Sequence, residues 1–196
     1  TYKSLDLIEK NVEEIYKDGK RVFGIGGEHL VTLPEIKAVS KFYKDLAIVH
    51  FDAHTDLREE YLGEEMSHSA VIRHASKIAG PENIKQIGIR SGMKEEWEFM
   101  KEYKTLISEY SELDVLKDKK IFVTVDLDVL DPSVMPGTGT PESGGMQFNE
   151  LIGWFEYLKN FDIIGADVVE LAPDYDASGV STAVATKVIR ELLMVM

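Results

Sequence analysis

The chain has 196 residues, a formal net charge of -13, 44% hydrophobic residues and no cysteine. This length suffices for one domain with a full core, and the acidic charge argues against nucleic acid as a partner. No stretch reads as a signal peptide or is apolar enough to span a bilayer, so we expect no membrane partner. The lack of cysteine excludes disulfide and thiolate chemistry and fits a cytoplasmic location.

Helical and strand patterns alternate along the chain. The patterns predict helices at 4–18, 33–42, 67–78, 94–104, 149–158 and 180–194, and a short helix at 112–116. They predict strands at 21–25, 46–51, 84–89, 120–125 and 161–169, and a short strand at 106–107. Segments 55–67 and 131–145 read as loops. The candidate helix caps are Ser4 or Asp6 for the first helix and Ser178 or Ser181 for the last.

The predicted strands are continuously apolar rather than alternating between apolar and polar residues. This pattern is typical of a mostly parallel sheet that is covered by helices on both faces. We therefore expect an α/β fold with three layers, α/β/α, and a single domain over residues 1–196.

Acidic residues and histidines follow the predicted strands. Asp52, His54 and Asp56 alternate after one strand, and Asp126 and Asp128 alternate after another, so the side chains of each set face one side. Carboxylates that converge in this way repel each other unless a cation lies among them. Ligands of parallel α/β sheets bind beyond the carboxyl ends of the strands. The sequence thus predicts a multivalent metal centre at this edge.

Four ordered motifs resemble those of the ureohydrolase (arginase and agmatinase) family. They are Gly26-Gly27-Glu28-His29, Asp52-Ala53-His54-Thr55-Asp56, the segment from Asp126 to Pro132, and the segment from Gly139 to Gly145. The resemblance runs from about Gly24 to the end of the chain. It implies an arginase-like fold and a hydrolase with two Mn²⁺ ions that cleaves a guanidinium group and releases urea.

The resemblance also assigns roles to single residues. One Mn²⁺ would be held by His29, Asp52, Asp56 and Asp126, and the other by Asp52, His54, Asp126 and Asp128, with Asp52 and Asp126 bridging. Oxygen and imidazole donors without thiolate suit Mn²⁺ better than Zn²⁺.

Other residues are assigned to the substrate and to support of the site. Glu170 would bind the guanidinium group, His68 would carry protons to the leaving amine, and Thr140 would steady the substrate. Asp131 is a candidate for support of the metal ligands. We interpret His50 as a core histidine or as support for a ligand, and His74 as structural.

The substrate is expected to be a small cationic guanidino compound. The loop after Asp56 contains four glutamates and no asparagine, which would repel a carboxylate and tolerate the second cation of agmatine. Agmatine cleavage to putrescine and urea is therefore the preferred interpretation. Arg58 is the counter-argument, because it offers a site for the carboxylate of arginine or of another guanidino acid.

Three interpretations from other classes stay open. The chain could be a metal-binding relative without catalysis, a relative that cleaves an amide, or a calcium-binding module. Retention of Glu170 and His54 argues against the first two, and two histidine ligands disfavour the third.

The sequence also departs from the family pattern. Glu28, Leu30 and Ser69 stand where Asp, Ser and Gly are usual, and none of these changes removes a predicted ligand. The resemblance also leads us to expect a further strand and an arginine–glycine loop before the first motif, and a protein without them would lose one edge of the sheet and part of the pocket rim. The resemblance implies a homo-oligomer, either a trimer or a hexamer.

Overall fold

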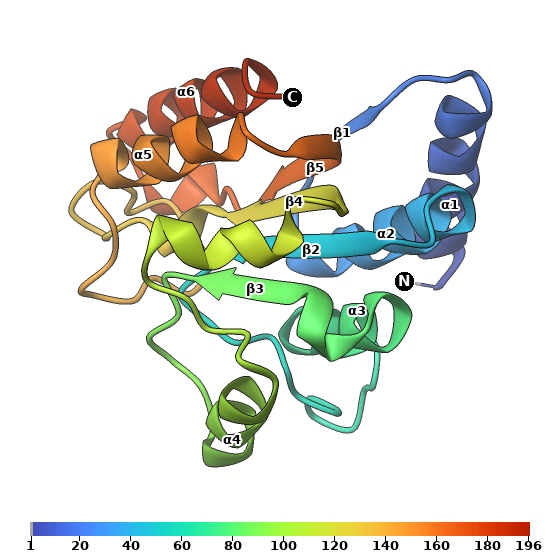
Figure 1. Ribbon diagram of the computed structural model, residues 1–196. Helices are drawn as coiled ribbons and strands as arrows, with labels where there is room; N and C mark the ends of the chain where they lie inside the picture. Colours follow the sequence, from blue (N-terminus) through green and yellow to red (C-terminus); the bar gives the residue numbers. More distant parts are fainter. Residues whose placement is uncertain (1) are drawn as a thin grey trace.

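The computed structural model describes residues 2–196, and its centre is a five-stranded parallel sheet (Figure 1). The strand order is β1-β5-β4-β2-β3, and every neighbouring pair is parallel. The strands are β1 (Val22–Ile25), β2 (Leu46–Phe51), β3 (Ile84–Ile87), β4 (Lys120–Asp126) and β5 (Asp162–Val169). The three central strands, β5, β4 and β2, are almost entirely buried, which explains why their sequences are continuously apolar.

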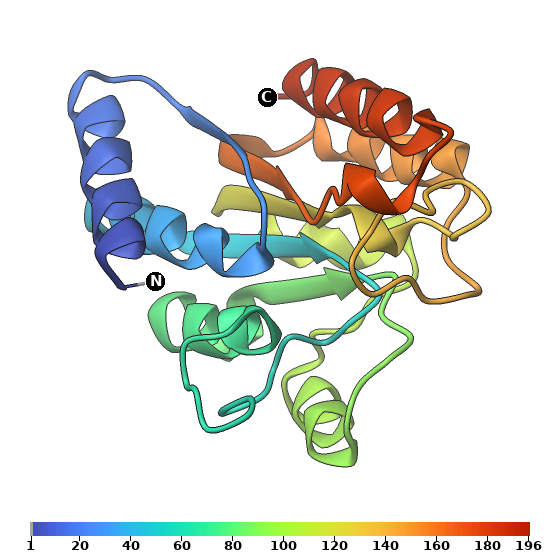
Figure 2. The same cartoon turned by 180° about the vertical axis from the view of Figure 1, so that it is seen from behind.

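Helices cover both faces of the sheet, as Figures 1 and 2 show. They are α1 (Tyr2–Lys17), α2 (Thr32–Phe42), α3 (Val71–Ala79), α4 (Lys94–Tyr103), α5 (Phe148–Leu158) and α6 (Val180–Leu193). Buried residues of α1 to α4 form one hydrophobic core with one face of the sheet. Residues of α5 and α6 form a second core on the other face. The predicted three-layer α/β/α architecture is therefore confirmed.

Most of the predicted elements are present, with small shifts at their ends. The stretch at 106–107 is not a strand, because it contributes only one isolated bridge, between Leu106 and Gln86. The short helix predicted at 112–116 is a 3-10 helix, Tyr110–Leu116. The helix predicted at 67–78 begins with a 3-10 turn, His68–Ala70, before α3.

The caps predicted for α1 are wrong, whereas the predicted Ser178 accepts the N–H of Val180, the first residue of α6, at 3.2 Å. Helix α1 already includes Tyr2, so Ser4 and Asp6 lie inside it. Helix α6 begins after Gly179, and Ser181 lies inside the helix, where its Oγ accepts a bond from the Gly137 N–H at 2.7 Å. Serine and aspartate near a helix start are ambiguous signals, because hydroxyls and carboxylates also serve tertiary contacts.

Strand β3 ends two residues earlier than its apolar sequence predicts. Gly88 follows the strand with φ +91, a conformation that favours glycine. A Cβ atom at this position would lie 2.5 Å from Val129 Cγ2 and 3.0 Å from the Asp52 carbonyl oxygen. The chain turns here because the end of β2 and the turn after β4 press closely against it.

Within residues 2–196, no helix combines the length and the apolar character that crossing a membrane requires.

Candidate metal centre

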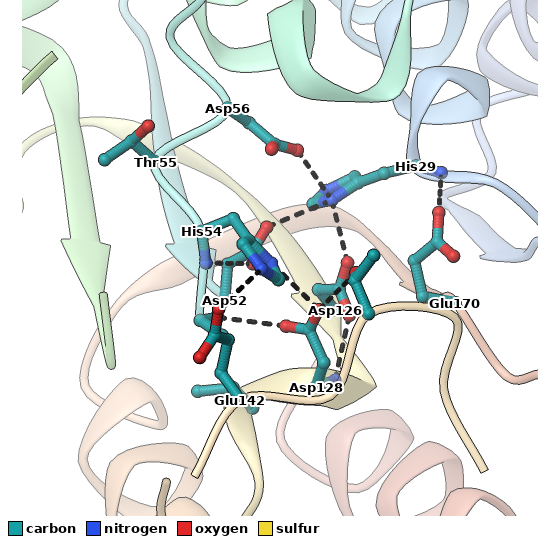
Figure 3. Close-up of polar contacts among 12 residues, drawn as sticks. His29, Asp52, His54, Thr55, Asp56, Asp126, Asp128, Glu142 and Glu170 are labelled. Carbon is teal, nitrogen blue, oxygen red and sulfur yellow. Dashed lines mark hydrogen bonds and ion pairs between the residues drawn. The ribbon is translucent and has the colours of Figure 1, made fainter. Parts of the chain in front are cut away.

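The predicted metal ligands converge at the carboxyl ends of β1, β4 and β2 (Figure 3). Asp52 directly follows β2, and Asp126 is the last residue of β4. His29 opens the 3-10 turn His29–Val31 that follows β1. Because β1, β4 and β2 run in the same direction, their ends present these side chains at one edge of the sheet.

His29 is the centre of a first cluster. Its Nδ1 atom lies 3.3 Å from a carboxylate oxygen of each of Asp52, Asp56 and Asp126, and Figure 3 shows the three acids around the ring. Asp56 reaches this position with φ 51, which aspartate tolerates better than most residues. Its carbonyl oxygen accepts the N–H groups of Ile72 and Arg73 in the first turns of α3. The start of α3 thus helps to hold this carboxylate in place.

Asp52 belongs to both clusters. Its Oδ2 atom faces His29, whereas its Oδ1 atom accepts the His54 N–H at 2.6 Å and lies 3.4 Å from His54 Nδ1. The same His54 nitrogen lies 3.0 Å from Asp128 Oδ2. Asp52, His54 and Asp128 form this second cluster. One carboxylate with an oxygen in each cluster has the arrangement of a bridging ligand.

Asp126 contacts the first cluster through Oδ2 and uses its other oxygen locally. Asp126 Oδ1 accepts the Asp128 N–H at 2.8 Å. The bridging role predicted for Asp126 therefore stays a prediction, while the two sides of Asp52 are visible in the hydrogen-bond pattern.

His50 also lies close enough to the first cluster to resemble a ligand. Both of its ring nitrogens are occupied, however. The Gln86 side-chain amide lies 3.1 Å from His50 Nδ1, and its orientation is set by Thr105 Oγ1, which donates to the amide oxygen at 2.9 Å. His50 Nδ1 therefore accepts, and Nε2–H donates to Asp52 Oδ2 at 2.8 Å. His50 supports Asp52 and has no free lone pair for a metal.

The donor set fits divalent metal ions. His29 Nδ1 is buried and has no hydrogen-bond partner, although three carboxylate oxygens surround it at the same distance. Donor atoms held about 2.1 Å from one octahedral ion lie about 3 Å from each other. An unpartnered nitrogen among equidistant oxygens is therefore what an ion at their common centre would require.

The pKa shifts of the acids and of His54 also indicate a cation site. Burial, followed by the negative charge of Asp52, raises the pKa of Asp56 to about 6 and that of Asp126 well above its usual range. Burial opposes protonation of His54, but Asp128 and Asp52 raise its pKa to about 11. Carboxylates that resist ionisation and an imidazole that holds its proton indicate excess negative charge, which a cation would neutralise.

Glu170 lies beside the first cluster. It follows β5 with φ 65, an uncommon conformation for glutamate, and its N–H donates to the Gly27 carbonyl at 2.8 Å. Its Oε1 atom accepts the His29 N–H at 2.7 Å, and burial raises the pKa of its carboxyl. One carboxylate oxygen remains for another donor. The chain geometry thus aims Glu170 at the metal cluster.

A pocket of about 560 Å³ opens over these residues. Its lining includes four of the predicted ligands together with Glu170, Thr140 and His68. Thr140 Oγ1 lies 3.4 Å from Asp128 Oδ2. The His68 ring packs edge-on against Tyr61, with centroids 5.5 Å apart, and its Nδ1 lies 3.8 Å from Glu28 Oε1. The structure thus places every predicted site residue at or beside one cavity.

The remaining candidates lie further out. Asp131 accepts the N–H groups of Gly144 and Gly145 at 2.8 and 3.1 Å, so any support that it gives to the metal ligands acts through the loop at 139–145. His74 lies on α3 and its Nε2 contacts the Glu65 carbonyl at 2.9 Å, away from the clusters.

Sequence reasoning missed the groups behind His29. His29 Nε2 lies 3.0 Å from Thr124 Oγ1, and Thr32 Oγ1 donates to Asp167 Oδ2 at 2.6 Å. Asp167 is fully buried in β5. An acidic residue within an otherwise apolar strand was the available signal, because such a charge is buried only where polar partners surround it.

The fold and these clusters together define an α/β protein with a carboxylate–histidine metal centre at the carboxyl edge of its sheet. Comparison with known proteins gives the family. The model of the arginase family matches residues 1–195, and the chain belongs to the arginase family.

Individual relatives agree with this assignment. Agmatinase from Bacillus subtilis is 48% identical over 98% of this chain and 69% of its own length. A protein from Clostridium difficile with a known crystal structure is 48% identical to this chain. The two structures match with a TM-score of 0.95 over 100% of this chain and 74% of that one. Proclavaminate amidino hydrolase from Streptomyces clavuligerus is 30% identical, with a TM-score of 0.86 over 100% and 70% of the two chains.

Proposed function

We propose that the chain hydrolyses the guanidinium group of agmatine, producing putrescine and urea, with two Mn²⁺ ions as cofactors. The observation that carries the proposal is the pair of His–Asp clusters that share Asp52, in a chain 48% identical to an agmatinase. The predicted ligands are His29, Asp52, Asp56 and Asp126 for one ion, and Asp52, His54, Asp126 and Asp128 for the other.

Oxygen donors with one imidazole in each set favour Mn²⁺ over zinc. When bound, such a pair of ions supplies the Lewis acidity that turns water into a nucleophile near neutral pH. The protein contributes the fixed positions of the donors. Asp52 is held by His50 and by the His54 N–H, and Asp128 accepts the Ala53 N–H at 3.0 Å. Ligands held in this way keep their geometry without reorganisation.

Glu170 would bind the substrate. A carboxylate accepts two parallel N–H bonds from a guanidinium group, and Glu170 lies beside His29 with one oxygen still available. Binding there would place the guanidinium carbon over the metal clusters. The unusual backbone conformation of Glu170 supports this role, because strained residues persist mainly where a site needs them.

His68 would move protons between the pocket and the leaving amine. Its side chain is about half exposed, at 46%, so it can exchange protons with solvent. Imidazole is the side chain best suited to this exchange near neutral pH. The contacts of the ring with Tyr61 and Glu28 limit its orientations.

The charged residues that line the pocket favour agmatine, although the four glutamates of the loop after Asp56 are not among them. The acids Glu28 and Glu96 line the pocket, and the one arginine in its lining, Arg58, lies 3.9 Å from Glu96 and over the Tyr61 ring. The charge of Arg58 is thus partly countered, which leaves the rim suited to a cationic amine. Arg58 also supports the second candidate, hydrolysis of arginine or another guanidino acid, because a carboxylate could displace Glu96 from it.

The test compares both substrates on one preparation. The purified protein loaded with Mn²⁺ is assayed for urea with agmatine and with arginine at equal concentrations. We expect the larger kcat/KM for agmatine, and Glu170→Gln should lose most of that activity while it still binds Mn²⁺. Faster turnover of arginine would reject the agmatine assignment, and no urea from either compound would reject the hydrolase.

We further propose a homo-oligomer, either a trimer or a hexamer, on the strength of the family resemblance alone. Light scattering of the purified protein measures the mass directly, against 22.1 kDa for one chain. A monomer at micromolar concentration would contradict this part of the proposal.

A further inference from the structure

Arg90 differs from the other arginines of the chain. Each of the other four lies within 3.9 Å of a carboxylate. Arg90 has no such partner among residues 2–196, and its Nε atom is buried without a hydrogen bond. A half-buried guanidinium without a counter-charge is costly. The compensation here comes from backbone carbonyl oxygens alone.

The guanidinium group joins three segments that are distant in sequence. Arg90 Nη2 donates to the carbonyls of Asp128 and Glu142, both at 2.7 Å. Arg90 Nη1 donates to Gly88 and Val129 at 3.1 and 3.2 Å. These acceptors belong to the end of β3, to the turn after β4 and to the 139–145 loop. A planar guanidinium with five donors can serve these four acceptors at once, whereas a lysine has only three donors.

The segments that Arg90 joins surround the second cluster. The 139–145 loop places Thr140 Oγ1 3.4 Å from Asp128 Oδ2, and Glu142 Oε1 3.9 Å from His54 Nε2. Figure 3 shows Glu142 beside His54 and Asp128. Arg90 therefore ties the backbone of Asp128 to the loop that contacts the side chains of Asp128 and His54.

The fit around the guanidinium is close. A Cβ atom at Gly145 would lie 2.6 Å from Arg90 Nη2 and 2.6 Å from the Asp131 nitrogen. Asp131 holds the same loop from the other side through the N–H groups of Gly144 and Gly145. The loop is thus clamped between Arg90 and Asp131, and glycine at 145 permits the approach.

We propose that Arg90 is a positioning residue for the second metal ion, because it fixes Asp128 and the 139–145 loop relative to His54. This inference rests on the proposed function, since it assumes two ions. The first cluster depends on Arg90 far less. His29 and Asp56 are held by other segments, and Asp126 is a residue of strand β4.

The test measures Mn²⁺ binding in two steps. Equilibrium dialysis with metal analysis is carried out on the wild type, Arg90→Met, Arg90→Lys and a control, Arg73→Met. The Arg73 side chain is also partly buried and pairs with Glu59, while Arg73 contacts Asp56 through its backbone N–H, which the substitution keeps. We expect both Arg90 variants to bind the first ion as the wild type does and the second about 10- to 100-fold more weakly, the usual effect of removing support behind a metal ligand. Arg73→Met should bind both ions normally.

The outcomes separate this inference from the proposed function. Equal weakening of both ions, or no weakening, overturns the role of Arg90 and leaves the proposed function standing. A wild type that binds no Mn²⁺ overturns both. If neither Arg90 variant folds, the same binding measurement is made on Asp131→Ala. This substitution removes the hydrogen bonds that hold the other side of the 139–145 loop. The same selective loss of the second ion supports the proposal, and unchanged binding of both ions rejects it.

Discussion

At the residue scale, Asp52 is the residue that belongs to both clusters of the proposed metal centre. It is fully buried, and each carboxylate oxygen faces a different cluster. Burial works against its charge, yet His50, His29 and His54 hold the pKa of Asp52 well below its usual range. Asp52 is thus negatively charged, whereas its acidic neighbours resist ionisation. Its charge therefore attracts both proposed ions.

We expect Asp52→Asn to lose both Mn²⁺ ions, because an amide offers one neutral oxygen where the carboxylate offers two charged ones. Asp128→Asn is the matched change, since Asp128 belongs to the second cluster only. It should lose one ion and keep the other. Metal analysis after dialysis measures both, and full occupancy in Asp52→Asn would contradict the bridging arrangement.

At the scale of the elements, the ends of the strands decide the geometry of the site. Gly88 ends β3 beside the carbonyl of Asp52 and the side chain of Val129, with positive φ. A side chain here would strain the backbone and also push against two segments that carry proposed ligands.

Gly88→Ala should therefore lower the free energy of unfolding by about 3 kcal/mol, from about 1 kcal/mol of backbone strain and about 2 kcal/mol of overpacking. Gly63 provides the control. It also has positive φ, but nothing lies within 4 Å of an added Cβ atom, so Gly63→Ala should cost only about 1 kcal/mol. Urea unfolding compares the two, and equal losses would show that the contacts at Gly88 do not matter.

At the scale of the whole molecule, the metal centre links stability to pH. The pKa of Asp56 is raised to about 6 and that of His54 to about 11. Raised values favour the protonated groups in the folded state. Their contribution is largest at low pH and is lost as the pH rises through about 6 for Asp56 and about 11 for His54. Mn²⁺ binding requires the deprotonated groups instead, because a ligand must lose its proton before it can bind the ion.

We therefore expect Mn²⁺ to stabilise the protein more at pH 8 than at pH 6. Competition from the His54 proton alone weakens binding about tenfold per pH unit, so the gain in unfolding free energy should shrink by roughly 3 kcal/mol over this range. Thermal unfolding with and without Mn²⁺ at the two pH values measures the difference. A gain that does not change with pH would mean that no protons leave when the ion binds.

The sequence alone predicted the three-layer architecture and the residues that gather at the edge of the sheet. Continuous apolar runs predicted buried parallel strands, and they are buried because helices cover both faces of the sheet. The alternation of Asp52, His54 and Asp56 predicted a shared direction for their side chains, since strand ends keep a local geometry that sequence spacing expresses. His29 and Glu170 were placed at the same edge because every strand of a parallel sheet ends on one side.

Only the tertiary structure decided the strand order, the role of His50 and the position of Arg90. His50 has the same spacing from Asp52 as a ligand would, and only the orientation of Gln86 on the neighbouring strand shows that its ring donates to Asp52. Arg90 reads as an ordinary surface cation in sequence, but it joins carbonyls 38 and 52 residues away. Such contacts depend on long-range packing, for which local sequence periodicity carries no signal.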